Sequence, residues 1–177
     1  RRFTLRPNAL GGAVLTLLEG VGEAEARAFL ERHAGWLEAA LGRLPAPVTV
    51  APGVMLPVDG SPVEIARAPR PRARTQVKGG RLLIGAEATA GPAVATFLKA
   101  RARARLGALA EGHAQALGKP VRGIGIRDTR SRWGSCSSAG RLNFSWRIAM
   151  APPEVQAYLA AHEAAHLVEM NHSARFW

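Results

Sequence analysis

Two histidines and a glutamate near the C-terminal end of the sequence have the spacing of a metal-binding helix. They lie in the segment His162-Glu163-Ala164-Ala165-His166. Residues four apart on an α-helix share one face, so both imidazoles can reach one cation from the same side. Zinc favours nitrogen ligands of this kind, and a catalytic zinc takes three protein ligands and a water. The segment therefore predicts a zinc centre.

The third ligand is predicted to be His172, six residues beyond His166. If the helix continued, His172 would lie about 9 Å further along its axis, given a rise of about 1.5 Å per residue. The chain must therefore turn back, and we expect the break near Met170 or Asn171, because asparagine tolerates the left-handed conformation common at helix ends. Glu169, three residues after His166, is the alternative third ligand.

Glu163 is predicted to act as a general base and not as a ligand. It follows His162 on the helix, where its carboxylate can reach a metal-bound water whose pKa the metal lowers towards ~7. We expect a zinc-dependent hydrolase that cleaves a peptide or protein substrate. The metal would polarise the scissile carbonyl, and Glu163 would take a proton from the water and pass it to the leaving amine.

Two other functions could use the same residues. A metal centre with arginines around it could hydrolyse a nucleotide phosphoanhydride, although the sequence has no phosphate-cradling glycine loop. A zinc ion that only braces the fold would suit a non-enzymatic, nucleic-acid-associated module, with a closed four-ligand site and salt-dependent binding. Another divalent metal such as Ni²⁺, Fe²⁺ or Mn²⁺ would also suit a three-histidine site, since geometry and availability decide selectivity.

The alternative to a metal site is a helix whose histidines are exposed or satisfied within a core. Three of the five histidines fall within residues 162–172, and their neighbours are largely apolar. Burying two histidines and a glutamate without partners would be costly, so the metal interpretation is favoured. The other two, His33 and His113, lie on other predicted helices, where we expect surface or satisfied core positions.

Residues 132–146 form a second distinctive segment. Ser135 and Cys136 are disfavoured as nucleophiles, because no base of their own accompanies them, and Cys136 is disfavoured as a ligand. Two interpretations stay open and can both hold: an edge strand that pairs with an extended peptide, and a tight turn packed under two tryptophans. Candidates for contacts with the substrate or its oxyanion are Arg132, Trp133 and Arg147, with Tyr158 and Arg175 as further candidates.

A longer set of residues surrounds these motifs: Arg132-Trp133-Gly134-Ser135-Cys136, Leu142-Asn143-Phe144-Ser145-Trp146-Arg147, Pro152, Tyr158, the His162-to-His166 segment, and Asn171-His172-Ser173 followed by Phe176-Trp177. This set resembles the YgjP-like metallopeptidase family, which is related to the SprT-like zincins. The resemblance is dense over residues 121–177 and looser over residues 1–120.

The resemblance implies a zincin-like core made of a helix, a β hairpin and the motif helix. It also implies zinc on His162, His166 and His172, with Glu163 as the catalytic base. Members of the family usually continue past the Phe176-Trp177 pair, so we expect this chain to be truncated at its C-terminus.

Hydrophobic periodicity and turn residues place these motifs in an α+β fold. We expect a hairpin over residues 3–17 with its turn at Gly11-Gly12, short strands over 48–85 with turns at Asp59-Gly60 and Lys78-Gly79-Gly80, and a β pair formed by 121–127 and 141–148. We expect helices over residues 23–43, 91–117 and 153–170. The predicted division is a β-rich N-terminal region with one helix, residues 1–90, and a metal-binding catalytic region, residues 91–177.

The chain has a formal net charge of +11, and 21 of its 24 lysine and arginine residues are arginine. The arginines are scattered, which favours codon bias, but weak nucleic-acid or phosphate contacts through a basic surface remain an alternative. Residues 66–74 are expected to form a solvated, arginine-rich loop, with a phosphate-binding strip as the alternative. Arg101, Arg103 and Arg105 are expected to spread around their helix.

A single cysteine, Cys136, excludes an internal disulfide. That is compatible with a reducing compartment, so we expect a cytoplasmic protein. No stretch approaches the ~20 apolar residues of a membrane span, and no membrane association or signal peptide is predicted.

Overall fold

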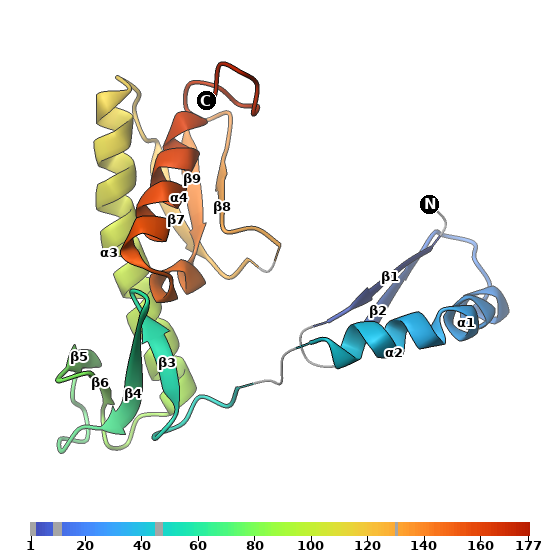
Figure 1. The fold of residues 1–177 in the computed structure, drawn as a ribbon, viewed down its shortest axis with the longest axis horizontal. Coiled ribbons are helices and arrows are strands. Elements are labelled where there is room, and N and C mark those ends of the chain that lie inside the picture. The colour runs from blue at the N-terminus through green and yellow to red at the C-terminus, as the bar shows by residue number, and fades with distance from the viewer. Residues whose placement is uncertain (1–2, 9–11, 45–47, 130) are drawn as a thin grey trace. The chain divides into compact units, whose positions relative to one another are not determined.

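The computed structural model describes residues 3–8, 12–44, 48–129 and 131–177. It contains helices and several small sheets (Figure 1), which is compatible with the predicted α+β class. The chain forms two compact units, Arg1–Thr49 and Val50–Trp177. The boundary that the sequence predicted near Ala90 falls inside the second unit, where strands before it and helices after it share one core.

The first unit combines a hairpin with two helices. Strands β1 (Phe3–Pro7) and β2 (Ala13–Leu17) pair antiparallel, as expected, although Gly11 of the predicted turn lies outside the described residues. The helix predicted over residues 23–43 is interrupted, giving α1 (Glu23–Arg32) and α2 (Ala34–Gly42).

His33 lies at the break between α1 and α2. Its ring nitrogen Nδ1 is 2.8 Å from the carbonyl oxygen of Phe29, and its ring stacks on the Phe29 ring. His33 is thus satisfied locally, as expected for a histidine with no metal role. Trp36, on α2, is 52% exposed.

The second unit begins with a four-stranded sheet made of β3 (Met55–Val58), β4 (Ser61–Arg67), β5 (Gln76–Lys78) and β6 (Arg81–Ile84). The strand order is β3-β4-β6-β5, with β4 and β6 parallel and the other pairs antiparallel. Both predicted hairpin turns are confirmed. Asp59, Gly60, Gly79 and Gly80 all have positive φ angles, which two-residue hairpin turns require.

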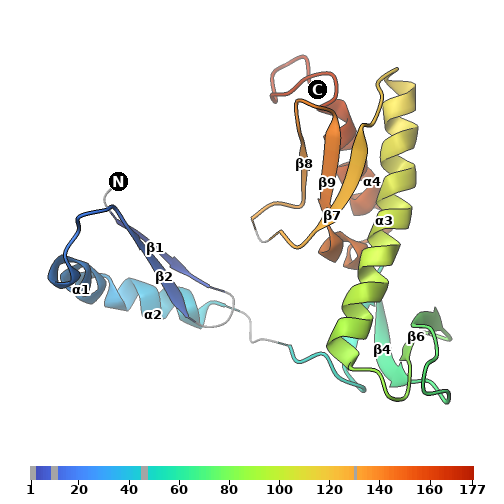
Figure 2. The ribbon, with the colours of Figure 1, turned by 180° about the vertical axis from the view of Figure 1, so that it is seen from behind.

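Helix α3 (Ala90–Ala116) confirms the long helix that the sequence predicted. It buries one residue in every four along its whole length: Ala90, Val94, Leu98, Ala102, Leu106, Ala110 and Ala114. Helix α4 (Pro153–Ala165) packs beside it (Figure 2) and buries Gln156, Ala160 and Ala164 at the same spacing. Because alanine is small, these two stripes let the helix backbones approach closely.

A three-stranded sheet completes the unit, with β9 (Arg141–Ser145) between β7 (Gly123–Arg127) and β8 (Gly134–Cys136). The predicted pairing of residues 121–127 with 141–148 is confirmed in part. The pair β7–β9 is parallel, and β8, which lies in the predicted loop, carries the chain back and pairs antiparallel with β9. Residues 146–148 of the predicted strand instead begin a 3₁₀ helix, η1 (Trp146–Met150).

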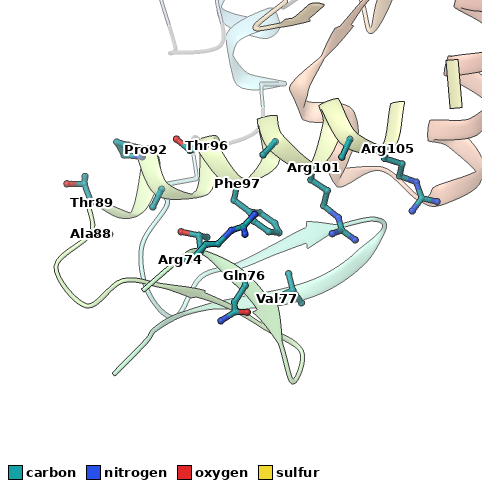
Figure 3. Close-up of a pocket in the computed structure, with 14 residues that line it drawn as sticks. Arg74, Gln76, Val77, Ala88, Thr89, Pro92, Thr96, Phe97, Arg101 and Arg105 are labelled. Carbon is teal, nitrogen blue, oxygen red and sulfur yellow. The ribbon is translucent and has the colours of Figure 1, made fainter. Parts of the chain in front are cut away.

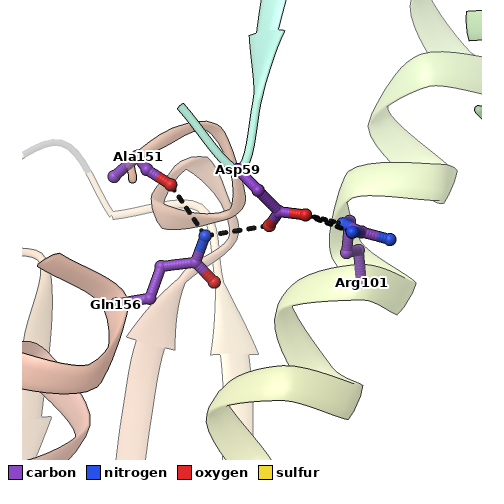
Figure 4. Close-up of polar contacts among 4 residues, drawn as sticks. All are labelled: Asp59, Arg101, Ala151 and Gln156. Atoms are coloured by element: carbon purple, nitrogen blue, oxygen red, sulfur yellow. Dashed lines mark hydrogen bonds and ion pairs between the residues drawn. The ribbon is translucent and has the colours of Figure 1, made fainter. Parts of the chain in front are cut away.

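The turn between β3 and β4 connects several elements of this unit. The backbone N–H groups of Asp59 and Gly60 donate to carbonyl oxygens of η1 at 2.9 and 3.1 Å. The Asp59 carboxylate accepts hydrogen bonds from Nε of Arg101 on α3, at 2.6 Å, and from Nε2 of Gln156 on α4, at 3.0 Å (Figure 4). The fully buried Gln156 side chain also donates to the carbonyl oxygen of Ala151 at 2.7 Å. Through its backbone and the Asp59 carboxylate, this turn therefore links the sheet to η1 and to both long helices.

Burial by itself raises the pKa of the Asp59 carboxyl, but the hydrogen bonds from Arg101 and Gln156 outweigh burial and hold the pKa below its usual value. A carboxyl whose pKa is lower in the folded state adds stability above its unfolded pKa, near 3.8. That stability is lost as the pH falls through the folded pKa.

Among the helices of the described residues, none combines the length and the apolar character that crossing a bilayer requires.

We expect Asp59→Asn to lower the free energy of unfolding by roughly 1–3 kcal/mol at pH 7, because it removes the charge that Arg101 and Gln156 contact. Asparagine keeps the shape of the side chain and tolerates the positive φ of 48° at this position. Denaturant unfolding measures the change, which should shrink as the pH falls below about 3.8 and disappear once the pH is below the lowered pKa of the folded Asp59 carboxyl.

Asp128→Asn is the matched control, since Asp128 also pairs with an arginine, Arg147, but is 59% exposed. An exposed pair contributes less than about 1 kcal/mol. Equal losses in the two variants would show that Asp59 does not link the elements of this unit.

Candidate metal centre

Helix α4 places His162 and His166 on one face, as their spacing predicted. Their ring centroids are 5.0 Å apart, edge to face, and both side chains are partly buried. The helix ends at Ala165, with His166 as its C-cap residue. The break is therefore earlier than the predicted one near Met170 or Asn171, because tight turns from Ala164 and Ala165 to residues 167 and 168 replace the regular helix.

This early break brings His172 back to the helix. Its Nε2 atom lies 3.0 Å from Nε2 of His162, and potential ligand atoms of His162, His166 and His172 all lie within 4.8 Å of one another. Nitrogen ligands on a tetrahedral zinc lie roughly 3.3 Å apart, given Zn–N distances of about 2.0–2.1 Å. The donor set therefore fits a divalent metal of this size.

A backbone contact orients the His166 ring. Its Nδ1 atom lies 3.0 Å from the carbonyl oxygen of Glu169, so Nδ1 carries the proton and donates it. That assignment leaves Nε2 free to bind a metal, which is how carbonyl groups commonly orient metal-ligating histidines. Glu169 thus orients His166 through its backbone carbonyl group. In the described part of the chain, the cluster of potential metal ligands contains His172 and not the Glu169 carboxylate.

His162 is also prepared to act as a ligand. Burial, followed by the neighbouring His166 and His172, lowers the pKa of its imidazole below the usual value. The lowered pKa favours the neutral imidazole that a histidine ligand requires.

Glu163 is buried beside the histidines, with 5% of its surface exposed. Burial raises the pKa of its carboxyl above the usual value, and the nearby His166 only partly opposes that effect. Its carboxylate lies against the backbone of Gly134, the first residue of β8. A Cβ atom at Gly134 would approach Oε1 of Glu163 to 2.3 Å, which no real structure tolerates.

Sequence reasoning missed this role of Gly134. A glycine that opens a short strand, between a tryptophan and a serine, was the available signal. Glycines at such positions often mark a close approach to another group.

Aromatic rings cover the three histidines. The Phe176 ring lies 4.7 Å from His166, 4.8 Å from His172 and 5.1 Å from His162, between centroids. Tyr158, one helical turn before His162, lies 6.0 Å from its ring and is 61% exposed. Of the further substrate candidates, Tyr158 thus has a place beside the cluster. The contact of Phe176 was not predicted, since a tertiary fold-back creates it.

The other predicted contact residues have partners of their own. Arg147 pairs with Asp128 and lies over the Trp146 ring at 4.5 Å. Arg132 is exposed, and its carbonyl oxygen accepts a hydrogen bond from Thr129. Trp133 is 57% exposed, and its carbonyl oxygen accepts the Ser145 N–H at 2.7 Å. Their roles in substrate contact stay predictions. Trp133 directly precedes Gly134, where an added Cβ atom would meet the Glu163 side chain.

Cys136 has the properties of a structural thiol. Burial and the nearby Glu163 carboxylate raise the pKa of its thiol, and its sulfur contacts the carbonyl oxygen of Ser137 at 3.4 Å. A raised thiol pKa disfavours the thiolate that a nucleophile or metal ligand requires.

These side chains define a class of protein: one with three clustered histidines that could hold a metal ion, and a buried carboxylate next to them. The chain belongs to the YgjP-like metallopeptidase family, because the family model described as "YgjP-like, metallopeptidase domain" matches residues 1–177. No curated protein and no solved structure matches the chain.

We expect His172→Ala to weaken zinc binding by at least about a hundredfold, since loss of a direct ligand should exceed the 10–100-fold effect of removing a supporting contact. Titration with a competing chelator measures the affinity. Glu169→Ala is the matched control. It removes the rival carboxylate but keeps the carbonyl oxygen that orients His166, so affinity should hold. The reverse order of effects would make Glu169 the third ligand.

Proposed function

We propose that this protein is a zinc-dependent peptidase in which Glu163 is the general base. One observation carries the proposal. The Glu163 carboxylate is buried directly beside three histidines whose ring nitrogens lie close enough together to bind one metal ion. Membership of a metallopeptidase family supports the same reaction.

His162, His166 and His172 would hold the metal. A zinc ion bound there supplies Lewis acidity, which polarises a substrate carbonyl and lowers the pKa of water towards ~7. Only three candidate ligands cluster among the described residues, and Cys136 is not one of them. Three ligands leave a coordination position open, as catalytic sites do and closed structural sites do not.

Glu163 would move the proton during hydrolysis. It would accept one from the attacking water and then deliver it to the nitrogen of the leaving amine. Burial raises the pKa of its carboxyl, which brings the pKa closer to neutral pH and makes both transfers easier. The contact with Gly134 would hold the carboxylate in the orientation that these transfers require.

The edge of β8 offers a place for the substrate backbone. β8 pairs with β9 on one side, and its other edge pairs with no strand in the described residues. It also contacts α4, which carries Glu163. An extended peptide that added to β8 as a further strand would bring its backbone close to Gly134 and Glu163. This geometry favours a peptide over a nucleotide as substrate.

Glu163→Gln tests the proposal. With zinc retained, we expect peptide hydrolysis to fall by roughly 10²–10⁴-fold, the usual contribution of a general base. Hydrolysis of an unstructured protein such as casein, followed by fluorescence, measures the activity, and elemental analysis confirms the metal. Undiminished activity in the variant, or nucleotide hydrolysis without peptide hydrolysis in the wild type, would contradict the proposal.

The same substitution should not unfold the protein. An acid whose pKa is raised in the folded state reduces stability once the pH exceeds its unfolded pKa, near 4.5. Neutral glutamine removes that penalty, so the melting temperature of the metal-free variant at pH 7 should equal or exceed that of the wild type.

Gly134→Ala should lower hydrolysis by about a hundredfold, because the new Cβ must displace the Glu163 carboxylate by an ångström or more. Zinc content should stay unchanged, since the histidines keep their positions. Gly112→Ala, in α3, is the control, because a Cβ there meets open space and the change should stabilise the helix by about 0.5–1 kcal/mol. Full activity in Gly134→Ala would show that this contact does not position the base.

A further inference from the structure

A groove of about 1250 Å³ lies between β5 and the first half of α3. It contains none of the residues of the metal cluster. In both views of the fold, β5 and β6 lie towards the N-terminal end of α3, whereas the C-terminal end of α4, which carries the histidines, lies towards the other end (Figures 1 and 2). The groove is therefore separate from the metal centre.

The floor of the groove is an apolar surface that the helix leaves uncovered. Val77 on β5 pairs with Leu82 on β6, so their side chains lie on the same face of the sheet. Leu82 is fully buried, but Val77 is 40% exposed. On the helix side, Phe97, Ala100 and Ala104 continue the apolar lining.

Three arginines line the same groove: Arg74 before β5, and Arg101 and Arg105 on α3. Figure 3 shows Arg101 and Arg105 pointing from α3 towards the side where β5 lies. The three arginines of α3 were expected to spread around the helix. Arg103 does lie apart and donates to the carbonyl oxygen of Ile124 on β7, but Arg101 and Arg105 share the groove. Arg101 is paired with Asp59. Arg74 is exposed, and the buried Nε atom of Arg105 has no hydrogen-bond partner.

The charge along this part of the chain is one-sided. Residues 67–105 contain ten arginine or lysine residues and one acidic residue, Glu87. Two acidic residues from outside this span offset part of the charge, because Asp59 pairs with Arg101 and Glu64 pairs with Arg81. A second small hollow lies next to Arg74 along the loop that carries Arg70 and Arg72. A positive surface of this kind attracts acidic partners over a distance of about 10 Å at moderate salt.

β5 also offers backbone groups for pairing. It is the last strand of its sheet, and in the described part of the chain its outer edge pairs with no other strand. Such an edge can accept an extended polypeptide as an added strand, with specificity supplied by neighbouring side-chain sites.

We propose that this groove binds an extended acidic polypeptide segment. The segment would pair with the edge of β5, place apolar side chains over Val77 and Phe97, and set carboxylates against Arg74 and Arg105. A single-stranded nucleic acid fits the groove less well. It would need aromatic rings for its bases to stack on, and the lining provides one, Phe97, beside small aliphatic side chains.

The test uses the full chain carrying Glu163→Gln, so that bound peptide is not consumed. The probe is a fluorescein-labelled octapeptide of alternating glutamate and leucine, and binding is followed by fluorescence anisotropy. The control probe has glutamine in place of glutamate, and a competitor series uses an oligothymidine of similar length.

We expect the acidic probe to bind saturably and the glutamine probe to bind at least about tenfold more weakly. Arg74→Ala and Arg105→Ala should each weaken binding by about fivefold or more. Arg103→Ala, on the same helix and with the same loss of charge, should leave the affinity within about twofold of the parent.

Three results would overturn the proposal. One is the absence of saturable binding by the acidic probe. Another is equal weakening by Arg74→Ala, Arg105→Ala and Arg103→Ala, which would indicate attraction to net charge without a site. The third is tighter binding of oligothymidine than of the peptide, with the same arginine dependence, which would make the groove a nucleic-acid site.

Discussion

The close packing of α4 against α3 is the constraint on which the metal centre depends. Both helices present a small or buried residue every fourth position, and the fully buried Ala102, Ala110, Ala160 and Ala164 leave little space between them. With that face of α4 committed to α3, the adjacent faces have to carry Glu163 and the histidines. The Asp59 carboxylate strengthens the same arrangement, since it contacts a side chain from each helix. The rotation of α4, and with it the direction of the ligands, follows from core packing.

The same packing buries the Glu163 carboxylate beside the histidines. A carboxylate that is 5% exposed is disfavoured in its ionised form, and burial raises its pKa. The protein accepts this penalty next to three histidines, where a bound cation would offset it. The absence of a side chain at Gly134 makes room for the carboxylate. The Glu163 carboxylate is therefore buried, lies next to three potential metal ligands and contacts the backbone at Gly134. Such a combination is typical of a functional site.

The second unit carries two features at different places on one framework. Helix α4, β8 and the C-terminal return form the candidate metal centre, whereas the start of α3 and the edge strand β5 form the arginine-lined groove. Both features place an unpaired strand edge beside a helix that presents charged or ionisable side chains. The arrangement recurs because each small sheet of this unit ends in an edge strand, β5 or β8, that pairs on one side only within the described residues.

Local patterns in the sequence were sufficient to predict much of the fold and of the candidate metal centre. The i, i+4 histidines, the long helix and both glycine-containing hairpin turns could all be predicted, because helical periodicity and turn chemistry act over a few residues. The family could be predicted because the motifs over residues 132–177 resemble those of its members. The early end of α4 at Ala165, the parallel pairing of β7 with β9 and the division of the chain at residue 49 could not. Each depends on contacts between segments far apart in the chain. The same is true of Gly134 against Glu163 and of Phe176 over the histidines: the sequence contains these residues, but only packing in three dimensions decides that they meet.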